Sequence, residues 1–305
     1  MESYEKKVAG AIRLIQSIPQ DGPIEVAYSG GKDSDVILEL TKMSGIPFVA
    51  VYKQTTVDPP GTTAHVKKMG VVVLHPSTTL LKEIEKHGPP SRRVRWCCAM
   101  FKEYPTAHRV ILGIRRDESR VRAERYTEPE ICRSYGKGVT VRQYFPILEW
   151  TKEDVERFIK ERGIECAPRY YDENGVFHVE RRLGCLGCPM SQKGRIKDFK
   201  EYPKLLKEWV KATWKWMDSH PDAKSVARFG NAYNLMYANL FTNSWKDYEQ
   251  RLTLPVYPVG CEDIHAWRER YFGKGWKKGC GAKMNTRLFL EDTFGIKFED
   301  IYGKQ

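Results

Sequence analysis

The sequence predicts an α/β domain built on a parallel sheet with helices on both faces, followed by a mostly helical C-terminal region. In the first part of the chain, short apolar runs alternate with segments whose apolar residues recur at helical spacing. Beyond about residue 195 the apolar residues recur at helical spacing throughout, and aromatic residues become frequent. A chain of 305 residues can form one large domain or two unequal ones. We therefore expect a nucleotide-binding domain over residues 1–195 and a helical region over residues 196–305.

Four apolar runs have the length and composition of buried strands, and they cover residues 24–29, 47–52, 71–74 and 110–113. Residues 35–43 follow the first run with helical spacing, placing Val36, Ile37 and Leu40 on one side. Thr151 is a good N-cap for a further helix, because Glu153 and Asp154 then lie at the positive end of its dipole. Strands that alternate with helices in this way indicate a parallel sheet that binds nucleotides at the carboxyl ends of its strands.

The composition excludes a membrane-spanning protein and favours an anionic partner. No stretch reaches the roughly 18 consecutive apolar residues of a membrane helix, and the N-terminal residues 1–16 predict an amphipathic helix rather than a signal peptide. We therefore expect a cytoplasmic protein. The net charge of +12 suits nucleic acid or a phosphate-rich nucleotide, although a basic solvated surface explains the charge equally well. The Trp-rich segment after residue 195 is interpreted as core packing rather than as a surface for base stacking.

The strongest motif is the loop Ser29-Gly30-Gly31-Lys32-Asp33-Ser34, placed between a predicted strand and a predicted helix. The two glycines let the backbone approach phosphate oxygens, and the start of the helix favours negative charge. Ser29 and Ser34 can donate hydroxyl bonds, Lys32 adds a positive charge, and Asp33 can hold Mg²⁺. The alternative is a simple glycine turn with a capping serine. The spacing differs from that of a Walker loop.

Two close cysteine pairs, Cys97-Cys98 and Cys185-Leu186-Gly187-Cys188, predict a metal site, because structural disulfides are rare in a reducing compartment. Four thiolates suit a [4Fe–4S] cluster or a tetrahedral zinc ion. Adjacent cysteines strain zinc chelation, so the cluster is the preferred interpretation. A redox-active Cys-x-x-Cys pair is the main competing one.

The loop resembles the PP-loop of the N-type ATP pyrophosphatases, which split ATP between the α and β phosphates. Residues 24–190 also resemble the phosphoadenosine phosphosulfate reductase family through the loop, the cysteine pairs, residues 113–119 with Arg122, residues 146–150 and residues 182–189. The resemblance implies an adenine nucleotide alpha hydrolase-like sheet and a [4Fe–4S] cluster on Cys97, Cys98, Cys185 and Cys188. It further implies that Arg115, Arg116 and Arg122 hold the anionic part of the nucleotide, with Thr55, Thr56 and Asp58 lining the same cleft.

Two features depart from the sulfonucleotide reductases of this family. Those enzymes usually carry a degenerate first loop, whereas this chain has the full motif. They also end in a tail with a nucleophilic cysteine, whereas this chain ends FEDIYGKQ and has only Cys261 and Cys280 beyond the predicted cluster. Reduction therefore lacks an obvious nucleophile.

The leading hypothesis is an ATP pyrophosphatase that uses ATP, Mg²⁺ and a [4Fe–4S] cluster, with Lys32, Asp33 and Arg115 as catalytic residues. The combined features resemble the ATP-pyrophosphatase component of DNA phosphorothioation systems. That resemblance implies DNA or another nucleic acid as sulfur acceptor and a cysteine desulfurase as partner. A first alternative is an adenylyl- or phosphoadenylyl-sulfate reductase that releases sulfite. A second alternative is a non-catalytic subunit that senses nucleotide or binds nucleic acid.

Overall fold

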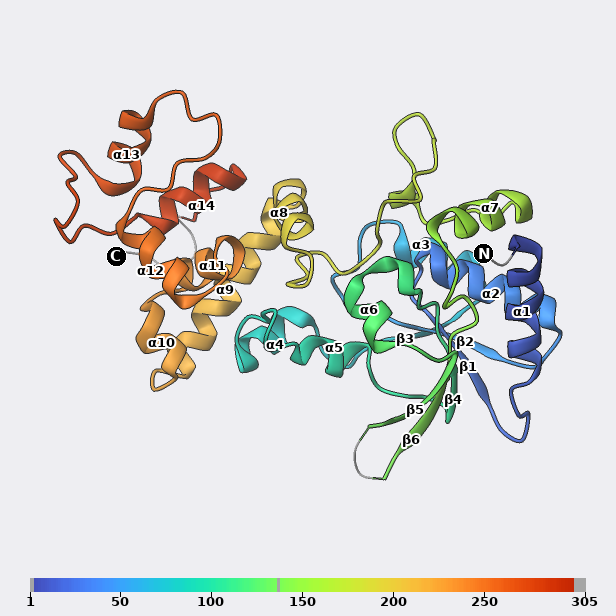
Figure 1. Cartoon of the computed structure of the whole chain (residues 1–305). Helices are drawn as coiled ribbons and strands as arrows, with labels where there is room; N and C mark the ends of the chain where they lie inside the picture. Colours follow the sequence, from blue (N-terminus) through green and yellow to red (C-terminus); the bar gives the residue numbers. More distant parts are fainter. Residues whose placement is uncertain (1–2, 136–137, 299–305) are drawn as a thin grey trace. The chain divides into compact units, whose positions relative to one another are not determined.

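The computed structural model describes residues 3–135 and 138–298, and the chain divides into two compact units (Figure 1). Unit 1 comprises Met1–Ser77 and Cys97–Cys185, and unit 2 comprises Thr78–Trp96 and Leu186–Gln305. Residues 78–96 therefore belong to unit 2, although they lie within the segment expected to form the first domain. The last residues, 299–305, on which the absence of a cysteine tail was argued, lie outside the described part of the chain.

Unit 1 contains a six-stranded mixed sheet with the strand order β3-β2-β1-β4-β6-β5. The strands are β1 (Ile24–Tyr28), β2 (Val49–Lys53), β3 (Val72–Leu74), β4 (Arg109–Ile111), β5 (Glu130–Ser134) and β6 (Thr140–Tyr144). All neighbours pair in parallel except β5 with β6. In the parallel register Val26 of β1 lies opposite Ala50 of β2 and Ile111 of β4. The central strand β1 thus has a parallel neighbour on each side, and the loops after these three strands emerge at one edge.

The four strands expected from apolar runs are present, and the predicted α/β class with a helical C-terminal region is confirmed. The hairpin of β5 and β6 was not predicted. Strand β6 buries Val141, Gln143 and Tyr144, whereas the outer strand β5 alternates exposed and half-buried positions and has no fully buried residue. An edge strand of this kind has too weak an apolar period to be distinguished from a loop.

Seven α-helices and two short 3₁₀ turns are described between residues 3 and 170, and one of these helices belongs to unit 2. They are α1 (Tyr4–Gln16), α2 (Lys32–Ser44), α3 (Thr62–Lys68), α4 (Leu80–His87, within unit 2), α5 (Trp96–Phe101), α6 (Arg120–Arg125), α7 (Lys152–Arg162), η1 (Arg116–Glu118) and η2 (Pro168–Tyr170). Thr151 caps α7 as predicted, in a capping box with Asp154. Helix α2 packs against α1 and α7, so the helix that follows the phosphate loop is held on two sides.

The core of unit 1 surrounds β1 and α2. Val26, Val36, Ile37 and Leu40 are fully buried in one apolar cluster that also contains Trp150. This burial of the predicted apolar side of α2 explains why that helix forms, because fully burying an aliphatic side chain stabilises the fold by about 1.5–3 kcal/mol. The first turn of α2, and with it the preceding loop, is thereby fixed against the sheet.

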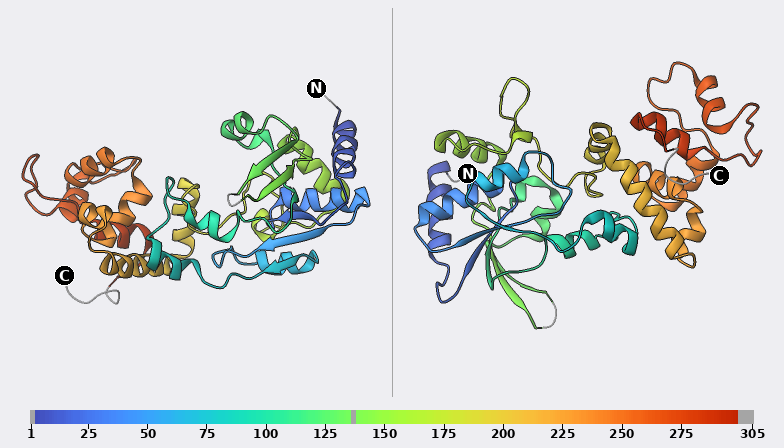
Figure 2. Two further views of the ribbon diagram at one scale, coloured as in Figure 1. Left: turned by 90° about the horizontal axis from the view of Figure 1, so that it is seen from below. Right: turned by 180° about the vertical axis from the view of Figure 1, so that it is seen from behind.

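Unit 2 is helical after residue 186, and the two views of Figure 2 show its succession of helices. The helices are α8 (Gln192–Glu201), α9 (Pro203–Ser219), α10 (Lys224–Phe229), α11 (Ala232–Phe241), α12 (Trp245–Thr253), α13 (Ile264–Phe272) and α14 (Thr286–Phe294). Trp209 is 1% exposed and meets Phe199 edge-on, and Trp245 packs similarly against Phe229. These contacts support core packing as the role of the tryptophans. Among the helices of the described residues, none is both long and apolar enough to cross a membrane.

We predict that Gly113→Ala displaces the phosphate loop. A Cβ atom at this position would stand 2.8 Å from the backbone oxygen of Asp33 and 3.0 Å from its carbonyl carbon, and the backbone cannot yield cheaply. Such overpacking lowers the free energy of unfolding by about 1–3 kcal/mol. Urea unfolding measures this change directly.

The matched control is Gly10→Ala, because its nearest heavy atom is the end of a flexible arginine at 3.9 Å and the residue lies inside α1. That substitution is expected to leave stability unchanged or to raise it by up to about 1 kcal/mol. Equal stability of the two variants would contradict the packing argument.

Candidate nucleotide site

The candidate site gathers loops from the carboxyl ends of three neighbouring parallel strands. The Ser29–Ser34 loop follows β1, residues 54–58 follow β2, and residues 112–115 follow β4. Parallel α/β sheets bind ligands at this edge, because the loops and the helix N-termini converge there. The predicted phosphate loop, the predicted arginine loop and Thr55 to Asp58 therefore share one edge of the sheet.

The phosphate loop itself is shaped by its glycines and serines. Gly30 adopts a φ of 75°, a conformation that glycine takes without strain, and a Cβ there would press against Thr62 at 3.1 Å. Ser34 donates its hydroxyl to the Gly31 carbonyl at 2.6 Å, and Ser29 donates to Ser34 at 3.3 Å. Gly31 is the N-cap of α2 and has no side chain to cap the helix, although the Lys32 N–H is bonded to the Tyr170 hydroxyl and the Ser34 N–H to the Gly31 carbonyl.

The side chain of Lys32 is buried rather than extended into solvent. Its residue is 5% exposed, and its ammonium nitrogen lies 3.2 Å from Asp33 Oδ2 and 5.5 Å from the ring centroid of Tyr170. The Tyr170 hydroxyl accepts a hydrogen bond from the backbone N–H of Lys32 at 3.1 Å. Tyr170, which ends η2, was not identified from the sequence as a site residue. Its position 138 residues away along the chain gives no local signal.

Asp33 is the carboxylate around which the cations are arranged. Arg115 Nε donates to Asp33 Oδ1 at 2.7 Å, and Lys32 pairs with the other oxygen. Arg115 is only 3% exposed and also contacts Asp117 at 3.2 Å. A buried guanidinium needs such partners, because desolvation of an unpaired charge is costly. The pairing holds the charged groups of Lys32 and Arg115 at the two oxygens of one carboxylate.

Two more arginines add positive charge beside this pair. Arg122 contacts the Glu118 carboxylate, and Arg182 donates to the Glu118 carbonyl at 3.0 Å. Burial lowers the pKa of Arg122, and the positive charges of Arg182 and Arg115 act in the same direction, against the attraction of Asp33. Cations that depress one another's pKa gain free energy when an anion enters among them. Arg182 was quoted from the sequence only as part of a motif, and the structure adds it to the cationic group.

Arg116 is placed differently from the other predicted arginines. It begins η1, is partly exposed, and pairs with Glu149 at 2.9 Å. Its neighbour in sequence, Arg115, is buried toward Asp33, because consecutive side chains at this extended position point in different directions. The structure thus brings Arg115 and Arg122 to the loop and directs Arg116 to a surface ion pair.

Three buried polar side chains form a hydrogen-bonded network next to the phosphate loop. Tyr28 donates to Asp35, and His65 Nε2 lies 2.8 Å from the Tyr28 hydroxyl and 3.0 Å from Asp35 Oδ1. Burial raises the pKa of Asp35, although hydrogen bonds from His65 and Tyr28 act in the opposite direction. Burial also raises the pKa of the Cys166 thiol, which lies against the same carboxyl group. The network links β1, α2 and α3, and it was not predicted, because its members are dispersed in the sequence.

The second loop of the site carries backbone strain and meets a predicted cluster ligand. Asp58 accepts hydrogen bonds from both the backbone N–H and the hydroxyl of Thr55, each at 2.8 Å. Thr56 has a φ of 65°, an outlier for a β-branched residue and a conformation that occurs mainly at functional sites. The Cys185 thiol lies 3.5 Å from the Thr55 hydroxyl. The loop after β2 and the first cysteine of the Cys-x-x-Cys motif therefore meet within unit 1.

Cys98 and Cys185 share a cationic neighbour, Lys102. Burial disfavours the charged form of Lys102, but attraction to Cys185, Asp58 and Cys98 outweighs this effect and raises the pKa of the ammonium group. The thiols of two different motifs therefore lie close enough to act on one residue. Such an ammonium stabilises thiolates over thiols, as a metal–thiolate site requires.

The four predicted ligands are not assembled into a closed metal site. Over residues 3–135 and 138–298, no group of three or more His, Cys, Asp or Glu side chains is arranged to hold a metal ion. Cys97, Cys98 and Cys185 belong to unit 1 and Cys188 to unit 2, so the division between the units falls at both cysteine motifs. The donor set has the right chemistry for an iron–sulfur cluster, although the described residues do not bring three of these thiols together. We derive no catalytic step through such a group.

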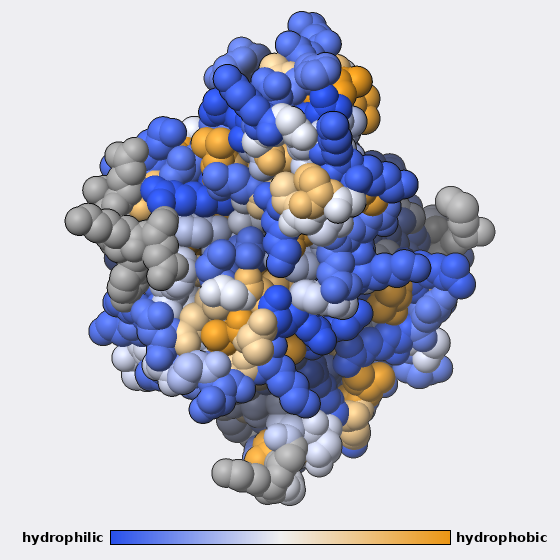
Figure 3. All heavy atoms as spheres, turned by 90° about the vertical axis from the view of Figure 1, so that its left-hand side faces the viewer, coloured by the Kyte–Doolittle hydropathy of each residue, from blue (hydrophilic) through white to orange (hydrophobic). Residues whose placement is uncertain are grey.

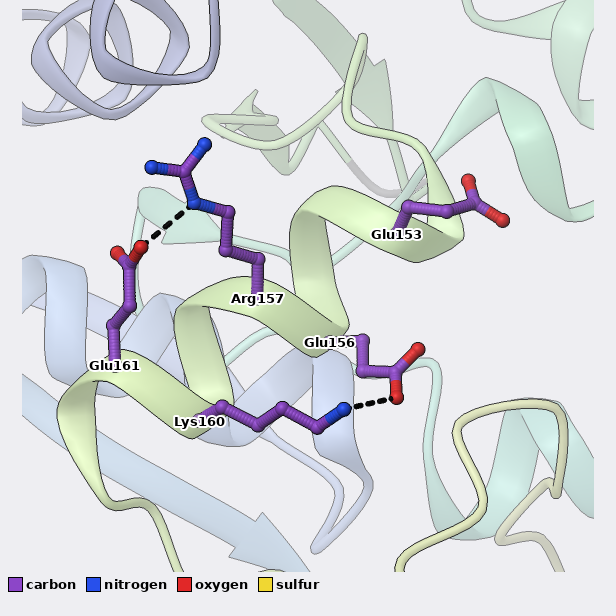
Figure 4. A pocket seen from close by; sticks show the side chains of 5 residues that line it. All are labelled: Glu153, Glu156, Arg157, Lys160 and Glu161. Atoms are coloured by element: carbon purple, nitrogen blue, oxygen red, sulfur yellow. Dashed lines mark hydrogen bonds and ion pairs between the residues drawn. The ribbon is translucent and has the colours of Figure 1, made fainter.

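A surface pocket elsewhere in unit 1 has no chemistry of this kind. It is lined by Glu153, Glu156, Arg157, Lys160 and Glu161, which all project from α7 (Figure 4). Arg157 pairs with Glu161 and Lys160 with Glu156, each at 2.7 Å. Both cations of this pocket are therefore paired with carboxylates of the same helix, and the pocket offers no excess of positive charge to a nucleotide.

Two curated proteins resemble this chain over part of its length. An uncharacterised protein of Methanocaldococcus jannaschii is 26% identical over 238 residues, covering 72% of this chain and 47% of that protein. Adenosine 5′-phosphosulfate reductase of Streptomyces coelicolor is 29% identical over 131 residues, covering 40% of this chain and 51% of that protein. The chain thus spans about half the length of the curated relatives it matches.

Solved structures with a related arrangement include two yeast enzymes. The phosphoadenylyl-sulfate reductase of Candida auris has a TM-score of 0.41 and 13% identity, over 60% of this chain and 93% of that one. The FMN adenylyltransferase of Candida glabrata has a TM-score of 0.40 and 14% identity, over 60% of this chain and 62% of that one. Likenesses at this distance assign no activity.

The family itself follows from the sequence of unit 1 and the start of unit 2. Residues 23–191, more than half of the chain, match the phosphoadenosine phosphosulfate reductase domain. The match includes the phosphate loop, the arginine loop and both cysteine motifs, and its sheet is the one whose carboxyl edge gathers the cations around Asp33. The chain belongs to the phosphoadenosine phosphosulfate reductase domain family.

Proposed function

We propose that the protein is an ATP pyrophosphatase that converts ATP to AMP and pyrophosphate while activating a substrate oxygen for replacement by sulfur. The observation that carries the proposal is the complete loop with Asp33 paired to both Lys32 and Arg115. A loop that accepts only an adenylyl sulfate has no need of a site for the β and γ phosphates. This loop keeps a buried lysine and a helix start without a capping side chain for those groups.

The residues of the site act mainly by positioning and by electrostatic stabilisation. In this proposal the glycine backbone and the start of α2 receive phosphate oxygens, and the buried Lys32 stabilises the charge that develops on the departing pyrophosphate. Arg115, Arg122 and Arg182 supply further positive charge beside the loop. Asp33 holds two of these cations in place before the nucleotide enters. Mg²⁺ bound with the nucleotide would neutralise phosphate charge, and Asp33 could contribute an oxygen to it by releasing Lys32 or Arg115.

The reaction then proceeds in three balanced steps. A substrate oxygen attacks the α-phosphorus, so that an O–P bond forms while the bond between the α-phosphorus and the bridging oxygen breaks and pyrophosphate leaves. The persulfide of a sulfur-donor protein such as a cysteine desulfurase next attacks the acceptor phosphorus, so that a P–S bond forms while the P–O bond to AMP breaks and AMP leaves. A second thiol, supplied by the donor protein or a thiol reductant, then attacks the S–S bond, which releases the phosphorothioate and forms a disulfide. The net charge of +12 supports a polyanionic acceptor, and we propose a phosphate of DNA or another nucleic acid.

The four cysteines Cys97, Cys98, Cys185 and Cys188 are proposed to hold a [4Fe–4S] cluster. Support comes from the two pairs of thiols and from the attraction that Cys98 and Cys185 exert on Lys102. Once bound, such a cluster would supply a redox centre beside the loop after β2. The proposed cleavage of ATP does not depend on it.

A second candidate function, reduction of an adenylyl sulfate to sulfite, is favoured by the likeness to the reductase of Streptomyces coelicolor. It needs a thiol nucleophile, and Cys280 is exposed with a pKa that backbone hydrogen bonds from Ala282 and Lys277 lower. The product assay below separates the two functions. Sulfite released from adenylyl sulfate, with no cleavage of ATP, would make the protein a reductase with its nucleophile in unit 2.

The proposal predicts AMP and pyrophosphate from α-labelled ATP under anaerobic conditions with Mg²⁺. Lys32→Ala is expected to reduce AMP formation about 100- to 1000-fold, as the loss of one charge-stabilising donor does elsewhere. Lys160→Ala, which removes a lysine paired on the surface of α7, should leave the rate unchanged. Binding of ATP with no AMP from the parent protein, even with nucleic acid and a sulfur donor present, would indicate a non-catalytic nucleotide sensor instead.

The cluster proposal predicts iron and acid-labile sulfide in equal amounts in protein purified without oxygen. Cys98→Ser and Cys185→Ser should each abolish most of the bound iron, because a cluster rarely survives the loss of a thiolate ligand. The control is Cys132→Ser, an exposed thiol on β5 outside both motifs, which should keep the iron. Iron content that is unaffected by the first two substitutions would exclude these residues as ligands, whatever the activity of the variants.

A further inference from the structure

The positive charge of the chain is concentrated in one of its two units. Unit 2 has 26 Lys and Arg against 16 Asp and Glu, a net charge of +10, whereas unit 1 has 25 against 23, a net charge of +2. The unit that contains the predicted nucleotide loop is therefore almost neutral. The excess that points to a polyanionic partner belongs to the helical unit.

Within unit 2, the connection between α13 and α14 carries charge of one sign only. Residues 273–283 read GKGWKKGCGAK and contain Lys274, Lys277, Lys278 and Lys283 without a single acidic residue. All four lysines are exposed. Figure 3 views the molecule from the side on which α13 is drawn in Figure 1, and hydrophilic residues cover most of that face. We call residues 273–283 the lysine loop.

The lysine loop is tied down at its base. The Asn285 N–H donates to the Tyr271 carbonyl at 2.7 Å, which closes the loop just outside its two ends. Trp276 packs edge-on against the buried Phe272, with ring centroids 5.7 Å apart. A turn from Cys280 N–H to the Lys277 carbonyl at 3.0 Å folds the distal part. The loop therefore has a defined base in the aromatic core of unit 2.

The ammonium groups of the lysine loop are not neutralised by the protein. None of the four lysines has an ion pair or a side-chain hydrogen bond among the residues that the structure describes. Lysines of α9 differ, because Lys211 pairs with Glu208 at 2.9 Å and Lys215 with Glu85 at 2.7 Å. Four neighbouring cations without acidic partners repel one another, and a polyanion relieves that repulsion while its counterions are released.

We propose that the lysine loop is a contact surface for the phosphate backbone of the nucleic acid whose phosphate the enzyme activates. This inference rests on the proposed function and assigns its partner to a segment of unit 2. Lysine is a flexible point charge suited to phosphates rather than to a planar base edge. The aromatic residue of the loop, Trp276, is engaged with Phe272, so the loop offers charge rather than a stacking platform.

The test measures binding of a fluorescently labelled DNA duplex at a series of salt concentrations. In the variant K274A/K277A/K278A/K283A, the slope of log affinity against log salt should become shallower by about 0.9 for each lysine that contacts a phosphate. Parallel titrations with single-stranded DNA and duplex RNA identify which nucleic acid shows the largest loss. Urea unfolding should be unchanged, because the four side chains have no partners among the described residues.

The matched control is K68A/K86A/K152A/K160A, which removes the same charge from four exposed lysines that have carboxylate partners. This control should keep the salt slope of the parent. Equal slopes for the two variants, or no salt-dependent binding by the parent, would overturn the assignment. Formation of AMP from ATP is measured on the same samples at low salt with saturating nucleic acid and a sulfur donor, so a failure of the lysine loop is distinguished from a failure of the ATP pyrophosphatase.

Discussion

The paired carboxylate of Asp33 is the interaction on which the candidate site depends. It binds Lys32 through one oxygen and Arg115 through the other, at 3.2 and 2.7 Å, and both cations are almost completely buried. Without this carboxylate, two neighbouring positive charges would repel each other under the loop and would be expensive to desolvate. With it, the cations are already in position when a nucleotide arrives, and such preorganisation accounts for much of enzymatic charge stabilisation.

The same pairing connects the loops that follow two neighbouring strands, so the geometry of the site depends on the sheet. Gly113, at the end of β4, passes so close to the backbone of Asp33 that no side chain fits between them. The loop after β1 and the loop after β4 are therefore in direct contact, and Arg115 reaches Asp33 because this contact is possible. Behind the loop, Asp35 and His65 anchor the first turn of α2 through buried polar contacts. These contacts engage Asp35 Oδ1, whereas its other oxygen, Oδ2, is buried without a hydrogen-bond partner among the described residues.

The four strands and the phosphate loop could be predicted from the sequence, because each carries a local signal of apolar runs or glycine spacing. Arg115 was expected only from the family resemblance, and the structure pairs it with Asp33. Tyr170 and His65 carried none, since a lone aromatic or histidine far along the chain has no period that reveals its partner. The hairpin of β5 and β6 was missed because its residues alternate too weakly in polarity. The predicted cluster lies between these cases: its thiols are clear in the sequence, but the described residues do not assemble them.

The measurement that tests the central claim most directly is positional isotope exchange in ATP labelled with ¹⁸O at the β non-bridging oxygens. Reversible cleavage between the α and β phosphates lets the bound pyrophosphate rotate, so the label appears in the α–β bridge even when little AMP is released. Our account predicts such scrambling when Mg²⁺ and the acceptor nucleic acid are present. It also predicts that scrambling is lost in Asp33→Asn, which leaves Lys32 and Arg115 without their shared charge. An absence of scrambling in the parent protein, with label confined to its original positions while sulfite forms from adenylyl sulfate, would contradict it.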